Sequence, residues 1–125
     1  MNIYEVVELE NSQLWLISAG LTLFQILVGN VMVFYGVLPY LLGLHALIAI
    51  VLLALSVYGY TRVKLDIERR ILIGNVALIV LISVLGYLYL SLDNSVIVLI
   101  HFLLALGLLS NFSVLYGFER GQRYR

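Results

Sequence analysis

Four long stretches of the chain are apolar almost without interruption and contain no charged residue. They run approximately over residues 14–38, 41–60, 71–90 and 96–118. Each is close to the length of about 20 apolar residues that a helix needs to cross a bilayer. Together they leave too little chain for a separate soluble domain. We therefore predict a single all-α integral membrane domain over residues 1–125, a bundle of four transmembrane helices.

The composition agrees with a membrane location and removes several classes of function. Hydrophobic residues make up 63% of the chain and charged residues 11%, against about half and a quarter in soluble domains. Seven acidic and seven basic residues cancel, so no charge excess points to a nucleic-acid partner and the lipid bilayer is the first partner expected. The chain has no cysteine, which excludes disulfides, thiolate nucleophiles, iron–sulfur clusters and c-type haem attachment.

The connections between the predicted helices differ in charge and so predict an orientation. Pro39 breaks the helix between the first two stretches, and residues 91–95 form a turn between the last two. Neither turn contains Lys or Arg, whereas residues 61–70 and the tail after residue 118 hold all seven basic residues. The positive-inside rule therefore predicts cytoplasmic N- and C-termini and two short outer turns, most simply in the plasma membrane of a prokaryote.

Features in the first half of the chain recur in the second half at nearly constant separation. Gly29, His45 and Ala49 have counterparts 57, 56 and 56 positions later. The counterparts are Gly86, His101 and Ala105. This spacing predicts that the bundle consists of two tandem helical hairpins, which both start on the same side of the membrane.

The two histidines are the strongest candidates for a binding site. Each lies six positions after the start of its predicted helix, at Pro39 or Ser95, so both lie about 9 Å below the outer surface. Ionisable residues inside membranes are costly and usually functional. Two imidazoles are too few ligands for zinc, but they satisfy the two axial positions of a haem iron. We expect His45 and His101 to ligate one haem b per chain, between the second and fourth helices.

Small residues near the histidines fit a flat apolar guest. Ala49 and Ala105 each follow a histidine by four positions, on the same helical face. Gly29 and Gly86 on the first and third helices would similarly admit the edge of a porphyrin, although small residues also simply let membrane helices approach. No Lys or Arg lies on the outer side to pair with haem propionates, which would depend on tyrosine, serine and asparagine side chains there.

These residues resemble a known family. Gln25 and Gly29, followed by His45 and Ala49, resemble the first helical hairpin of the heme A synthase family, in which a Gln-x-x-x-Gly helix precedes a His-x-x-x-Ala helix. The resemblance implies a four-helix half of that fold, with a haem held between histidines on its second and fourth helices and with Gln25 near the site. The chain lacks two features of the family. It has no glutamate just before the first histidine, and its outer connection is a short turn where the family often has an extended loop.

Several functions remain open from the sequence. The first is a small b-type cytochrome that takes electrons from quinol or from a membrane-protein partner. It would act alone, as a homo-oligomer or as a subunit of a respiratory complex. The second is a cofactor-free accessory subunit of a membrane complex, and the third is a compact heme A synthase-like enzyme. The last is a small four-helix transporter, which would lack any Asp or Glu within its spans to bind a cation.

Overall fold

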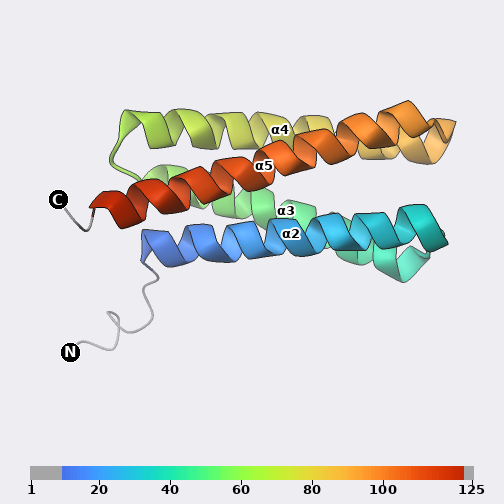
Figure 1. Cartoon of the computed structure of the whole chain (residues 1–125), viewed down its shortest axis with the longest axis horizontal. Helices are drawn as coiled ribbons and strands as arrows, with labels where there is room; N and C mark the ends of the chain where they lie inside the picture. Colours follow the sequence, from blue (N-terminus) through green and yellow to red (C-terminus); the bar gives the residue numbers. More distant parts are fainter. Residues whose placement is uncertain (1–9, 123–125) are drawn as a thin grey trace.

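The structure, a computed structural model, describes residues 10–122, which form four long helices and no strand (Figure 1). The helices are α2 (Asn11–Tyr35), α3 (Pro39–Arg62), α4 (Asp66–Leu92) and α5 (Ser95–Gln122). All four are long and apolar enough to cross a membrane. The predicted all-α class and the number of apolar helices are therefore confirmed.

The helix ends follow local chemistry rather than the limits of the apolar stretches. α2 ends at Tyr35, three residues before the predicted limit, because Gly36 takes a φ of 109° that a helix cannot continue. α3 begins directly at Pro39, where the missing N–H costs nothing. α4 begins before its apolar stretch, at Asp66, since acidic residues are favourable near a helix N-terminus. The side chain of Asn94 accepts a hydrogen bond from the Val96 amide and so caps α5.

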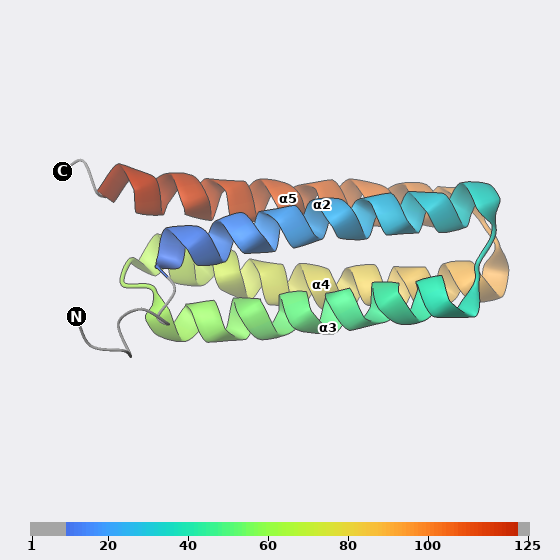
Figure 2. The same cartoon turned by 90° about the horizontal axis from the view of Figure 1, so that it is seen from below.

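The four helices form a ring in chain order. α2 packs on α3, α3 on α4, α4 on α5, and α5 closes the ring against α2. Figure 2 shows the same arrangement from below, with all helices nearly parallel to the long axis. α3 and α5 therefore lie diagonally across the bundle. We name the end where α2 begins, α3 joins α4 and α5 ends the terminal end, and the opposite end the turn end.

The tightest packing lies towards the terminal end. The ring of Trp15 stacks on that of Phe112, with centroids 6.2 Å apart and planes inclined by 23°. Trp15 also lies directly against Gly59, where any Cβ would collide with the indole. The remaining buried cluster is Leu14, Ile48, Leu52, Val63, Leu72, Ile79, Leu108 and Leu115. Many large apolar side chains point outward along all four helices, as in a bundle that faces lipid.

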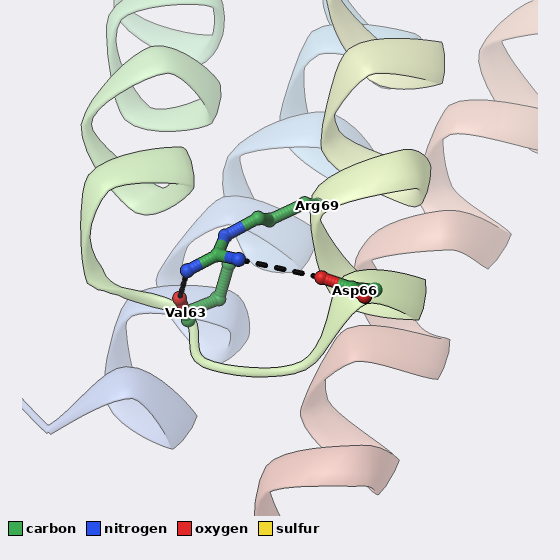
Figure 3. A network of polar contacts seen from close by, with 3 residues as sticks. All are labelled: Val63, Asp66 and Arg69. Atoms are coloured by element: carbon green, nitrogen blue, oxygen red, sulfur yellow. Dashed lines mark hydrogen bonds and ion pairs between the residues drawn. The ribbon is translucent and has the colours of Figure 1, made fainter.

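The connection between α3 and α4 is held by one arginine (Figure 3). The guanidinium of Arg69 donates to the backbone carbonyl of Val63 at 3.3 Å and lies 3.4 Å from the carboxylate of Asp66. Such exposed ion pairs contribute little to stability on their own. The bond to Val63 nevertheless fixes the short path that brings α4 back beside α3.

Candidate functional site

The two histidines face each other across the interior of the bundle. His45 lies in the second turn of α3 and His101 in the second turn of α5, at matching distances from the helix starts at the turn end. Because α3 and α5 are diagonal, neither helix blocks the space between the rings. The ring centroids are 6.3 Å apart and the planes are inclined by 39°. The two predicted ligands therefore lie close together in the interior of the bundle.

A backbone hydrogen bond orients the imidazole of His101. Its Nδ1 lies 2.8 Å from the carbonyl oxygen of Ile82 on α4. A carbonyl only accepts, so Nδ1 carries the proton and donates, which leaves the lone pair on Nε2. No residue within 10–122 forms a hydrogen bond with this Nε2. Ligating histidines commonly donate their other ring N–H to a carbonyl in this way.

His45 has a related but looser support from α2. The Nδ1 atom of its ring is buried and makes no hydrogen bond with residues 10–122. The side-chain amide of Gln25 donates instead to the backbone carbonyl of His45 at 2.6 Å. Gln25 therefore joins α2 to α3 at the level of the site, and its buried Oε1 has no partner among residues 10–122.

Two glycines make room for the two imidazoles. A Cβ added at Gly29 would lie 3.2 Å from Cε1 of His45, and a Cβ at Gly86 would lie 3.2 Å from Cε1 of His101. Each hairpin thus presses its histidine against its own glycine, and the two contacts repeat each other. The glycines therefore do more than permit helix contact: each sets how deeply its imidazole can lie towards the neighbouring helix.

A large cavity joins all the residues that the sequence singled out. Its volume is about 570 Å³, within the usual range for cofactor pockets of about 300–1,000 Å³. Its lining is mostly apolar and comes from all four helices. The lining includes Gln25, Gly29, His45, Ala49, Gly86, His101 and Ala105. The two alanines keep this space open below the histidines, where longer side chains would occupy it.

The residues present fit an axially ligated haem better than a bare metal ion. Bonds from a metal to imidazole nitrogen are about 2 Å long and the nitrogen lies about 1 Å from the ring centre, so two imidazoles on one metal have centroids roughly 6 Å apart. The observed distance is 6.3 Å. Residues 10–122 contain no cluster of three or more His, Cys, Asp or Glu side chains that could hold a metal ion. A porphyrin brings its own four nitrogen ligands to the iron, so it would need only two from the protein.

The structure adds lining residues that sequence reasoning missed. Thr22 on α2 and Ser83 on α4 also line the cavity. Each precedes a predicted site residue, Gln25 or Gly86, by three positions, and this spacing along one helical face was the available signal. The lining contains no Lys or Arg among the described residues, so neutral hydroxyl and amide groups are what the cavity offers to a polar substituent of the guest.

Other polar residues lie deeper in the bundle, below the cavity. The side-chain amide of Asn111 donates to Oδ1 of Asn75 at 2.8 Å and joins α5 to α4. At the terminal end, the carboxyl group of Glu68 is fully buried and contacts that of Glu119. The sequence places Glu68 within a charged connection and gives no direct sign of its burial.

Comparison with known proteins gives no relative for this chain. No family model, no curated protein and no solved structure matches it. The assignment of a function therefore depends on the geometry of the site.

Proposed function

We propose that the protein is a small b-type membrane cytochrome that binds one haem b between His45 and His101. The observation that carries the proposal is the diagonal pair of imidazoles at 6.3 Å, one of them with Nδ1 bound to a backbone carbonyl and Nε2 left to ligate. The resemblance of Gln25, Gly29, His45 and Ala49 to the heme A synthase family points to the same two ligands.

The protein residues have three tasks in this proposal. His45 and His101 would hold the haem iron through imidazole nitrogens, and Gly29 and Gly86 fix the depth of the two rings. Burial in the apolar lining lowers the local dielectric, which is one of the means by which a protein tunes a haem potential. When bound, the haem supplies one-electron transfer. The described lining holds no carboxylate, which favours electron transfer over a heme A synthase-like oxidation that uses one.

The surroundings of the site suggest where the electrons are exchanged. The cavity lies towards the turn end, whose connections carry no Lys or Arg, whereas the described basic residues lie at the terminal end, around the connection of α3 to α4 and near the end of α5. We place the terminal end in the cytoplasm and the turn end outside, in a prokaryotic plasma membrane. A quinol in the bilayer or a redox protein at the outer surface would then be within reach. The long apolar outer faces would allow a second copy or a larger respiratory complex to pack against the chain.

Replacement of the ligands tests the proposal. We expect His45→Ala and His101→Ala to abolish the low-spin haem spectrum of the purified protein, because each removes one axial nitrogen. His45→Met is an informative companion, since methionine also ligates haem iron and would shift the spectrum rather than remove it. A spectrum that is unchanged in both alanine variants would show that the histidines do not ligate haem. A protein that stays colourless when haem is added would instead favour a cofactor-free subunit.

A further inference from the structure

The residues that line the histidine cavity are exposed mainly where α3 meets α4. On α3 the exposed lining residues are Ala46 and Ile50, and on α4 they include Ser83, Val84 and Tyr87. On α5, by contrast, no described lining residue is exposed. The cavity therefore reaches the surface of the bundle along the seam between α3 and α4, and we name the opening formed by these five residues the lateral slot.

The slot residues lie on the flanks by which α3 and α4 face each other. The other inward flank of α3 belongs to α2, because Gly59 packs directly on Trp15. The other inward flank of α4 belongs to α5, because Asn75 accepts a hydrogen bond from Asn111. The remaining flanks of these two neighbouring helices meet along the slot.

The internal repeat shows what makes this seam different. The two hairpins are equivalent, so the α3–α4 seam has a counterpart between α5 and α2. Ala46 corresponds to Phe102, 56 positions later, and Ser83 corresponds to Ile26, 57 positions earlier. Ala46 and Ser83 are exposed, whereas Phe102 is half-buried and Ile26 is buried. Two small side chains therefore leave the slot open beside His45, where two large ones fill the counterpart.

The slot faces the hydrocarbon of the membrane. Ala46 and Ile50 lie 7 and 11 residues after Pro39, about 10 and 17 Å along α3. The 24 residues of α3 span about 36 Å, and the hydrocarbon core is about 30 Å thick, so both positions lie within the apolar layer. The cavity lining holds no charged side chain among the described residues. A molecule that enters sideways must therefore be uncharged and dissolved in the lipid.

We propose that a quinol from the bilayer docks in the lateral slot and reduces the haem, an inference that rests on the proposed haem site. The slot offers two hydroxyl groups, those of Ser83 and Tyr87. The Ser83 hydroxyl donates to the carbonyl of Ile79 at 2.7 Å and so remains free to accept a hydrogen bond from a quinol hydroxyl. A lipid acyl chain has no group to use these partners, whereas a quinol has two hydroxyls on its ring and an apolar tail that stays in the bilayer.

The electron balance follows from the chemistry of a quinol. Its oxidation to a quinone breaks two O–H bonds and releases two electrons and two protons. A ferric haem takes one electron. One quinol therefore reduces the haems of two chains, or one haem twice once the first electron has passed to a redox partner. The protons go to water at the turn end, which is the nearer end of the bundle.

A fluorescent label tests the slot without haem, because the natural chain has no cysteine. Val84→Cys places a bimane label at the slot, and Leu103→Cys places one on an exposed face of α5 outside the cavity. Both positions lie eight residues from the turn end of their helix. In vesicles that contain the cofactor-free protein, we expect decylubiquinone to quench the Val84→Cys label saturably, with half-quenching at about ten-fold lower concentration than for Leu103→Cys. Ala46→Phe should abolish this difference, and equal quenching at both positions without it would overturn the proposal.

Reduction kinetics test electron transfer in the haem-loaded protein. We expect decylubiquinol to reduce the haem and Ala46→Phe to slow this reaction about ten-fold, since the rate falls with docking affinity. Dithionite, which acts from water, should reduce both proteins equally. Leu47→Phe is the matched control, because Leu47 is the exposed neighbour of Ala46 and does not line the cavity. Where Ala46→Phe lowers the haem content, Ser83→Ile closes the same slot from α4.

The outcomes separate this inference from the cytochrome assignment. Wild-type rates of reduction by quinol in both Ala46→Phe and Ser83→Ile would overturn the slot as the docking site. A low-spin haem that quinol does not reduce would overturn the inference and leave the cytochrome assignment standing. A chain that binds no haem would overturn both.

Discussion

The contacts between the glycines and the imidazoles allow a graded test of how the histidines are positioned. A Cβ at Gly86 would lie 3.2 Å from Cε1 of His101, whereas carbon atoms in ordinary contact are about 3.5–4.0 Å apart. Gly86→Ala must therefore displace the ring by roughly 0.3–0.8 Å. The ring is also held at 2.8 Å from the Ile82 carbonyl, and a shift of this size weakens that bond. We expect haem affinity to fall by about 10–100-fold, as for other changes that disturb the support of a ligand.

The assay is a titration of haem into the cofactor-free variant, followed by the low-spin absorption bands. Gly74→Ala is the matched control, since it lies on the same helix and no heavy atom lies within 4 Å of the added Cβ. Alanine is a better helix former than glycine by about 1 kcal/mol, so neither variant should unfold for lack of helix propensity. Wild-type affinity in Gly86→Ala would refute the positioning argument. Equal losses in both variants would assign the effect to α4 as a whole.

Three further variants probe the cavity and its support. Ala49→Phe fills the cavity below the histidines and should prevent haem binding while the protein still inserts and folds; Ala54→Phe, on an exposed face of the same helix, should leave the haem spectrum unchanged. Trp15→Ala removes the stacked indole of the core and should lower the free energy of unfolding in detergent by about 3–5 kcal/mol, where a loss below 1 kcal/mol would contradict the described packing. Gln25→Leu removes the hydrogen bond from α2 to the His45 carbonyl. It should lower the free energy of unfolding by about 1 kcal/mol and broaden the low-spin bands. An unchanged free energy of unfolding together with unchanged bands would show that the bond is dispensable.

The repeat explains why much of the site could be predicted from the sequence. His45 and His101 occur at matched distances from helix starts that Pro39 and Asn94 mark chemically, so equal depth follows from counting along the chain. The structure adds that each glycine lies beside the histidine of its own hairpin. That pairing follows from the hairpin geometry, because Gly29 precedes the turn by nearly as many residues as His45 follows it.

The deeper polar features could not be predicted in the same way. Glu68 follows charged and turn-forming residues and has the pattern of an exposed acid, yet α4 begins early enough for its side chain to turn inward against Glu119. Whether the two histidine-bearing helices are neighbours or diagonal is also undetermined by periodicity, since both arrangements bury the same faces. The ring order α2–α3–α4–α5 places the two helices diagonally, with the rings of His45 and His101 6.3 Å apart.

The most direct test of the central claim is the reduced-minus-oxidised absorbance spectrum of the purified protein, combined with a pyridine assay for haem type and amount. The account predicts the sharp bands of low-spin haem b at about one haem per chain, with both bands and haem lost in His45→Ala and in His101→Ala. A protein that remains colourless after haem is supplied, or whose haem survives the loss of both histidines, would contradict it.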